Sequence, residues 1–198
     1  TTVLSIAMMT MVAFAGNDGK EDGRYKVKGE DSKIVWTGEK VTGFHTGNIA
    51  IKNGNISVEN GKLIAADVNV DMTSITCTDL EDPGYNSKLV GHLKSADFFN
   101  VDEHKNASFT MEKFEAKKGE NGANYLVHGT LTIKGISHPI SFPAKIDFVD
   151  GMMKAEGKIT FDRSKYDVRY GSGSFFDGLG DKMIYDDVVL DFVLVAEI

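Results

Sequence analysis

The stretch Gly91–Met111, GHLKSADFFNVDEHKNASFTM, joins a short helical segment to a strand through two adjacent aromatic residues. Leu89 and Leu93 are four residues apart, so they share one face of a helix. Phe98 and Phe99 would point to opposite sides of an extended chain, and at least one of them therefore needs an apolar partner elsewhere. The end of the stretch alternates apolar and polar residues with period two, as a strand does. The stretch predicts a short helical lid on a sheet.

Apolar and polar residues alternate through most of the chain on either side of this stretch. The alternation is clearest over residues 125–133 and recurs over residues 140–148, 153–161 and 188–194. Three dipeptides that tolerate the positive φ of a tight turn predict hairpins: Asn53-Gly54, Asn60-Gly61 and Asp150-Gly151. The pattern predicts an all-β fold of about eight antiparallel strands with one helical interruption, a number of strands that can close into a barrel around one small ligand.

The composition is that of a single globular domain. The chain has 198 residues, of which 41% are hydrophobic and 26% charged, so it can bury a core without disulfides. Its one cysteine, Cys77, excludes a disulfide within the chain. The net charge of −7 and the lack of a basic patch argue against nucleic acid as a partner and against electrostatic attachment to an anionic membrane.

Residues 1–15, TTVLSIAMMTMVAFA, form an uncharged apolar run that ends in Ala13-Phe14-Ala15, the small-residue pattern of a signal-peptide cleavage site. The run is shorter than the roughly 20 residues that span a bilayer, so we expect a signal peptide remnant and no stable membrane insertion after cleavage. A buried N-terminal helix is the alternative. Residues 16–31 are mostly polar, which predicts a flexible lead-in to a barrel domain over residues 32–198.

No catalytic or metal-binding motif stands out. The five histidines fall at no spacing typical of metal ligands, and we expect them on the surface or in loops. Asp186 and Asp187 are interpreted as solvated charges or edge protection at the start of a strand rather than as an acid/base pair. The sequence therefore predicts no enzyme, no bound metal and no cofactor.

Small residues alternate with large ones along the apolar faces, among them Ala66, Ala107, Gly129, Ala144 and Gly157. Such alternation fits two kinds of interior: a barrel filled by its own side chains, or a barrel that leaves a channel. Both interpretations stay open at this level.

Four segments, in this order, carry a family resemblance: His92–Val101, Gly129–Ile140, Phe161–Tyr166 and Val188–Phe192. Together they resemble the YceI-like family over residues 33–198. The resemblance implies an extended eight-stranded, lipocalin-like antiparallel barrel whose long apolar tunnel holds a polyisoprenoid or another long-chain lipid. It also implies export to the periplasm, in agreement with the reading of residues 1–15.

The function expected from these observations is binding of a long-chain apolar lipid, polyisoprenoid or fatty-acid-like, for transport, storage or sequestration. Two alternatives are an enzyme acting on such a lipid at the tunnel mouth, with His92 or Tyr166 as acid/base, and a ligand-free, stress-related interaction module. A homodimer is compatible with the sequence. The expected lining residues, each of which also fits a plain core, are Trp36, Val68, Val70, Phe109, Met111, Val127, Leu131, Phe142, Ile146, Ile159 and Phe192, with Leu93, Phe98, Phe99, Phe175 and Phe176 at the entrance.

Overall fold

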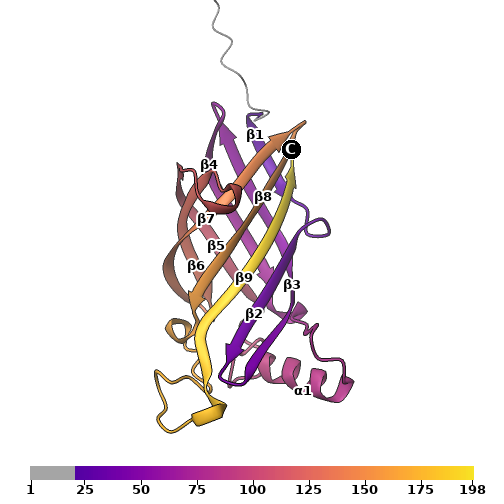
Figure 1. Cartoon of the computed structure of the whole chain (residues 1–198). Coiled ribbons are helices and arrows are strands. Elements are labelled where there is room, and N and C mark those ends of the chain that lie inside the picture. Colours follow the sequence, from indigo (N-terminus) through magenta and orange to yellow (C-terminus); the bar gives the residue numbers. More distant parts are fainter. Residues whose placement is uncertain (1–20) are drawn as a thin grey trace, which may run out of the picture.

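A computed structural model describes residues 21–198, which form a closed antiparallel β-barrel with one α-helix (Figure 1). The predicted signal peptide remnant, residues 1–15, lies outside the described residues. The strands are β1 (Gly23–Val27), β2 (Lys33–Lys40), β3 (Gly43–Glu59), β4 (Lys62–Asp71), β5 (Asn106–Ala116), β6 (Tyr125–Ile133), β7 (Ile136–Val149), β8 (Met152–Asp162) and β9 (Ile184–Glu197). The helix is α1 (Pro83–Lys94), and four short 3-10 helices are η1 (Met72–Ser74), η2 (Glu120–Gly122), η3 (Arg163–Tyr166) and η4 (Gly180–Lys182).

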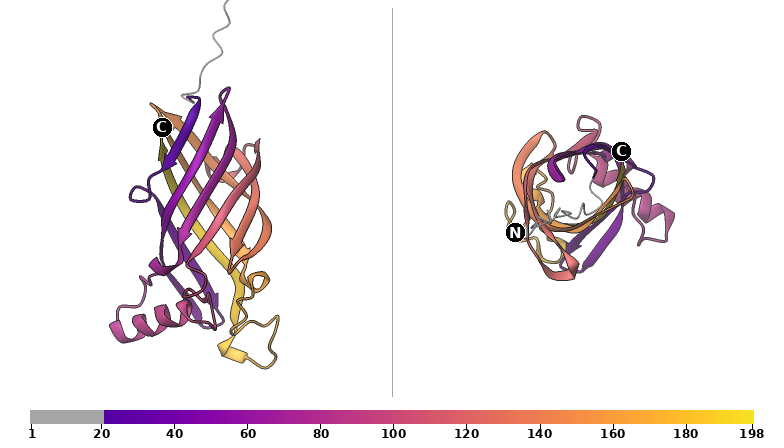
Figure 2. Two further views of the ribbon diagram at one scale, coloured as in Figure 1. Left: turned by 180° about the vertical axis from the view of Figure 1, so that it is seen from behind. Right: turned by 90° about the horizontal axis from the view of Figure 1, so that it is seen from above.

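The barrel has eight strand positions, as predicted, although nine strands build it within residues 21–198. Neighbouring strands follow the order β1-β3-β2-β9-β8-β7-β6-β5-β4, and pairing of β3 with β4 closes the ring. Both β1 and β2 pair with β3 on one side and β9 on the other, so they share one position, one above the other. Viewed along the barrel axis, the strands form a closed ring, whose interior we call the lumen (Figure 2).

Strand β1 corrects the prediction of a flexible lead-in for residues 23–27, while residues 16–20 lie outside the described residues. Tyr25 is completely buried, and its ring packs edge-on against Phe148 at 5.6 Å between ring centroids. It lies at the end of the barrel that carries the C-terminus, here named the upper end (Figure 1). The strand was missed because its apolar alternation covers too few residues, and because its partners on β3 and β9 are remote in sequence.

The predicted hairpin at Asn53-Gly54 is wrong, whereas the other two are confirmed. Asn60-Gly61 and Asp150-Gly151 both adopt positive φ and join β3 to β4 and β7 to β8. Asn53-Gly54 instead lies at a bulge inside β3, where the register with β4 shifts between Ile51 and Asn53. Glycine is needed there because a Cβ on Gly54 would lie 2.6 Å from the carbonyl oxygen of Asp67.

Two ladders in the wall are incomplete. The β7–β8 pairing ends at Ala144 and Gly157, so residues 136–143 and 158–162 have no partner across this interface. The β4–β5 pairing likewise covers only residues 67–71 and 106–110. The first interruption lies toward the lower end, which carries α1, and the second toward the upper end.

Two prolines account for the interruption between β7 and β8. The Asn124 N–H donates a hydrogen bond to the Ala144 carbonyl oxygen, and the Ile146 N–H donates to the side-chain oxygen of Asn124. Asn124 lies directly before β6, so the backbone N–H and C=O groups of even-numbered β7 residues face β6. Odd-numbered residues therefore face β8, and among them Pro139 and Pro143 have no N–H to donate. The lower half of β7 consequently lacks half of the donors that a ladder with β8 would need.

The side chain of Tyr166, on η3, fills part of this interruption. Its ring is 2% exposed and packs edge-on against His138 of β7 and Phe161 of β8, with centroid distances of 5.1 and 5.7 Å. His138 Nε2 also lies 3.0 Å from the carbonyl oxygen of Lys165. Side-chain contacts thus replace backbone pairing between these strands.

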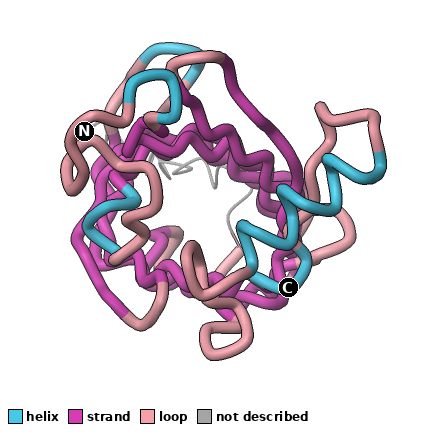
Figure 3. Tube along the Cα trace, turned by 90° about the horizontal axis from the view of Figure 1, so that it is seen from below, coloured by secondary structure: helices cyan, strands magenta, loops and turns pink. Residues whose placement is uncertain are grey.

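The expected short helix is present and lies at the rim of the lower end (Figure 3). Asp82 caps it by accepting a hydrogen bond from the Tyr85 N–H at 2.9 Å, and Pro83 occupies its first turn. Leu93 is its buried residue, and Leu89 packs against the same core. With 12 residues α1 is too short to cross a membrane, and no other helix within residues 21–198 is long and apolar enough to do so.

A buried arginine ties the loop of residues 167–183 to the lower end. Arg163 is 1% exposed, and its guanidinium donates to the carbonyl oxygens of Val168 (2.8 Å), Ile184 (3.1 Å) and Tyr185 (3.1 Å). Burial lowers the pKa of this guanidinium, and the nearby carboxylate of Asp186 opposes the effect.

Asp186 completes this anchor. Its Oδ1 lies 3.2 Å from Nη2 of Arg163, as an ion pair without hydrogen-bond geometry, while Oδ2 accepts hydrogen bonds from Ser172 (2.9 Å) and Ser174 (2.6 Å). The interpretation of Asp186 as a solvated charge or edge protection is therefore wrong. The sequence did not reveal its cationic partner, 23 residues earlier.

We expect Arg163→Met to reduce the free energy of unfolding by about 3–5 kcal/mol, because it leaves a carboxylate and three carbonyl groups without their donor. Chemical denaturation measures this loss. Lys165→Met, on the exposed side of η3, is the matched control and should change stability by less than about 0.5 kcal/mol. Equal losses in the two variants would contradict the anchoring role.

Candidate functional site

Two apolar cavities lie one above the other in the lumen. The lower cavity has a volume of about 190 Å³ and the upper cavity about 120 Å³. The upper cavity is lined only by apolar side chains, whereas the lower cavity has charged and polar side chains at its outer edge. The interior is therefore neither completely filled nor an open tube.

Three phenylalanine rings, Phe109, Phe142 and Phe192, form the boundary between the cavities, which we name the waist. The Phe142 centroid lies 5.3 Å from that of Phe109 and 5.7 Å from that of Phe192. All three line the upper cavity, while Ala107 and Leu190, two positions lower on the same strands as Phe109 and Phe192, line the lower one. The waist is where a long ligand would have to pass.

Glycines on neighbouring strands make room for two of these rings. A Cβ on Gly129 would lie 2.5 Å from the Phe109 ring, and a Cβ on Gly157 would lie 3.0 Å from the Phe192 ring. Each ring therefore lies against a glycine position where a side chain would displace it. The small residues noted in the sequence set the positions of the rings.

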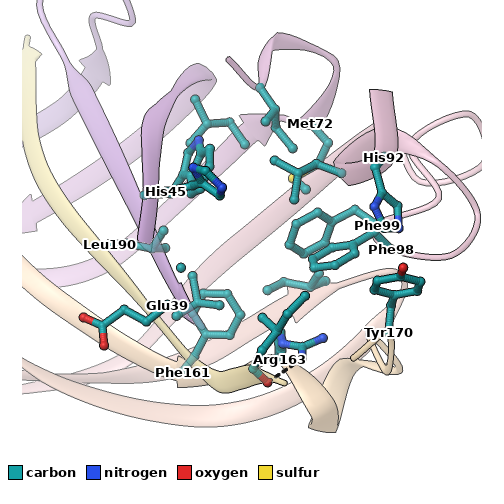
Figure 4. A pocket seen from close by; sticks show the side chains of 18 of the residues that line it. Glu39, His45, Met72, His92, Phe98, Phe99, Phe161, Arg163, Tyr170 and Leu190 are labelled. Atoms are coloured by element: carbon teal, nitrogen blue, oxygen red, sulfur yellow. Dashed lines mark hydrogen bonds between the residues drawn. The ribbon is translucent and has the colours of Figure 1, made fainter. Parts of the chain in front are cut away.

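The segment after α1 covers part of the lower cavity from below. Phe98 is 7% exposed, and its ring contacts Phe99, His92 and Tyr170 at centroid distances of 5.3, 5.6 and 6.4 Å. The Arg163 guanidinium lies 5.5 Å from the Phe98 centroid, as a cation–π contact. Figure 4 shows these side chains gathered around one space.

The rim of the lower cavity is polar and exposed. Glu39 and Lys40, at the end of β2, line it and are exposed, as is Tyr170. His45 and His92 line it from β3 and α1. A ligand in the lower cavity would therefore have apolar surroundings inside and water at its lower end.

The structure places 13 of the 16 predicted lining residues on the two cavities. Those on the lower cavity are Trp36, Leu93, Phe98, Phe99 and Leu131. Those on the upper cavity are Val68, Phe109, Met111, Val127, Phe142, Ile146, Ile159 and Phe192.

The other three predicted residues line neither cavity. Val70 packs against the core. Phe175 and Phe176, expected at the entrance, are 44% and 50% exposed, and the Arg169 guanidinium lies over the Phe175 ring at 4.7 Å. Tyr170, from the same loop, contacts Phe98 in their place.

Sequence reasoning missed several residues that line the lower cavity. Arg163 belongs to a segment that carried the family resemblance, but no local pattern indicates that its side chain is buried. Met72 and Ile75 line the cavity from η1 and the residues after it, outside any periodic strand. Tyr170 lies in a glycine-rich loop where the number of aromatic residues was the one available signal.

The two residues considered as an acid/base occupy different places. His92 lines the lower cavity, with its ring against Tyr170 at a centroid distance of 4.3 Å. Tyr166 is buried outside the cavity lining, and burial raises the pKa of its hydroxyl. They do not form a pair that faces a common ligand position.

Solved structures with a similar architecture have low sequence identity to this chain. The crystal structure of Burkholderia cenocepacia BcnA is 22% identical, covers 85% of this chain and 98% of that one, and superposes with a TM-score of 0.63. A polyisoprenoid binding domain from Saccharophagus degradans is 17% identical, covers 87% and 97%, and gives a TM-score of 0.66. At these identities the likeness shows the fold.

Sequence relatives match shorter segments. A UPF0312 protein of Serratia proteamaculans is 35% identical over 80 residues, and the match spans 40% of each chain. The chain thus aligns with about two fifths of that relative's length. The YceI-like domain model, by contrast, matches residues 25–196, and the protein therefore belongs to the YceI-like family.

Proposed function

We propose that the protein binds a long-chain apolar lipid, polyisoprenoid or fatty-acid-like, in the lumen and thereby transports, stores or sequesters it. The observation that carries this proposal is the pair of apolar cavities stacked along one barrel, of which the lower has a polar, exposed rim. Burial of alkyl chain supplies affinity at about 0.8 kcal/mol per CH₂, so no catalytic group is needed. The Saccharophagus domain, described as polyisoprenoid binding, supports this ligand class.

The ligand is proposed to contact the residues that line the two cavities and to extend through the waist. Together the two volumes reach the lower end of the roughly 300–1,000 Å³ typical of small-molecule pockets. A chain that occupies both cavities requires rotation of at least one ring of the waist. The polar end of the lipid would remain at the rim near Glu39, Lys40 and His92, where water can solvate it.

We also propose that the protein is exported to the periplasm, on the basis of the apolar run and the Ala13-Phe14-Ala15 pattern. Cell fractionation with N-terminal sequencing tests this proposal. A mature chain that begins near Gly16 in the periplasmic fraction is expected, and an uncleaved chain in the cytoplasm would contradict it.

Organic extraction of the purified protein, followed by mass spectrometry, should release a long-chain lipid in a stoichiometry approaching one per chain. Native mass spectrometry of the same sample should show the corresponding mass increase. The idea fails if the protein carries no lipid and also retains none after incubation with polyisoprenoid and fatty-acid vesicles.

Two adjacent alanines of β4 provide a matched test of the lumen. Ala66 lines the upper cavity, whereas Ala65 is exposed on the outer face. Ala66→Phe should fill the upper cavity and shorten the longest chain retained, while Ala65→Phe should leave the extracted lipids unchanged. Comparison of extracted chain lengths is the measurement, and identical lipid profiles in the two variants would exclude the upper cavity from the binding site.

A further inference from the structure

Three potential metal ligands of different chemistry meet beside the lower cavity: His45, Cys77 and Asp79. His45 lies on β3, and the segment of residues 76–78 runs alongside that strand. Thr76 N–H and Thr78 N–H donate to β3 carbonyl oxygens at 3.0 and 2.9 Å. Cys77 and Asp79, two residues apart on this segment, bring their side chains next to that of His45.

The ligand atoms are close enough to share one ion. His45 Nδ1 lies 2.8 Å from Asp79 Oδ2, and Cys77 Sγ lies 3.2 Å from Asp79 Oδ1. All three groups offer an atom within 4.8 Å of the others. A tetrahedral zinc ion with ordinary bond lengths separates its ligand atoms by roughly 3.3–3.7 Å, so small side-chain shifts would suffice.

The backbone around the cluster is held on several sides. Gly47 permits residues 76–78 to approach β3 closely, because a Cβ at this position would lie 1.8 Å from the Thr76 carbonyl oxygen. Trp36 Nε1 donates to that same oxygen at 3.0 Å. Asn86 Nδ2, from α1, donates to the Cys77 carbonyl oxygen at 3.0 Å. The three side chains are therefore brought together by fixed elements rather than by a free loop.

Hydrogen bonds already join the three side chains. The Thr46 N–H and the Cys77 thiol donate to Asp79 Oδ1 at 2.8 and 3.2 Å, and His45 Nδ1 lies 2.8 Å from Asp79 Oδ2. A cation at this place would replace the contacts among the three side chains.

We propose that His45 Nδ1, Cys77 Sγ and Asp79 Oδ2 bind a zinc ion, with the fourth coordination position open. Sulfur, imidazole nitrogen and carboxylate oxygen are all common zinc ligands. Binding releases the Cys77 thiol proton to solvent, and a neutral His45 ring that binds through Nδ1 carries its proton on Nε2. The thiolate and the carboxylate then balance the two charges of the ion. Within residues 21–198, this is the one cluster of three such groups.

His45 also lines the lower cavity, so the proposed site borders that cavity. Asp79 Oδ1 would keep the hydrogen bond that it accepts from the Thr46 N–H at 2.8 Å, and this hydrogen bond would hold the carboxylate in its orientation.

Zinc titration of the tag-free, chelator-treated full chain tests the proposal by calorimetry, together with metal analysis after dialysis. We expect one zinc per chain. Cys77→Ser and Asp79→Asn should each weaken binding by more than about 100-fold, beyond the roughly 10–100-fold typical of residues that only support a ligand. His128→Gln is the control, since the His128 ring is hydrogen-bonded to Ser141 outside the cluster. The zinc affinity of this variant should match that of the original chain.

Absorption of the cobalt-substituted protein provides a second measurement that needs no variant. A thiolate-to-cobalt charge-transfer band and intense ligand-field bands are expected for tetrahedral coordination by Cys77. Absence of the charge-transfer band, or equal zinc affinity in the original chain and Cys77→Ser, would overturn the proposal. Either result can be obtained whether or not lipid is found, so the two ideas fail separately.

Discussion

Closure of the wall depends on β3, because this one strand pairs with β1, β2 and β4. Its 17 residues span both halves of the barrel. The bulge at Asn53 shifts the inward positions from odd-numbered residues, such as Ile49 and Ile51, to even-numbered ones, such as Ile56 and Val58. Without that shift, one half of the strand would present its polar side chains to the lumen.

The same closure fixes what the lumen can contain. Side chains from all eight strand positions converge on one axis, so each large ring needs a small neighbour. Gly129 and Gly157 provide that space at the waist, and the cavities remain where no ring fills the interior. The two ends differ: near the upper end Tyr25 is fully buried against Phe148, whereas exposed polar residues line the rim of the lower cavity.

Most of the strands could be predicted because alternation is a local property of the chain. Residues 125–133 and 153–161 matched β6 and β8 for this reason. Turn dipeptides were less decisive. Asn60-Gly61 makes a hairpin and Asn53-Gly54 a bulge, and the difference lies in the approach of β1 and β4 to Gly54, which no local pattern reveals. Both dipeptides nonetheless marked positions where the backbone departs from a regular strand.

The parts of the site that escaped prediction depend on contacts between distant residues. Arg163 and Asp186 are brought together by the loop of residues 167–183, which connects their two segments. Cys77 and Asp79 meet His45 across more than 30 residues, so no ligand spacing appears in the sequence. Phe175 and Phe176 illustrate the reverse case, since their aromatic character suggested an entrance but the loop turns them toward solvent.

The interrupted β7–β8 and β4–β5 ladders have a mechanical consequence. A complete ring of hydrogen-bonded strands has a fixed girth, because each pair is held about 4.7–4.9 Å apart. Here neither half of the wall is such a ring: the lower half lacks β7–β8 pairing and the upper half lacks β4–β5 pairing. Each half of the wall therefore contains one interface that is held by side-chain packing and not by a complete ladder of backbone hydrogen bonds.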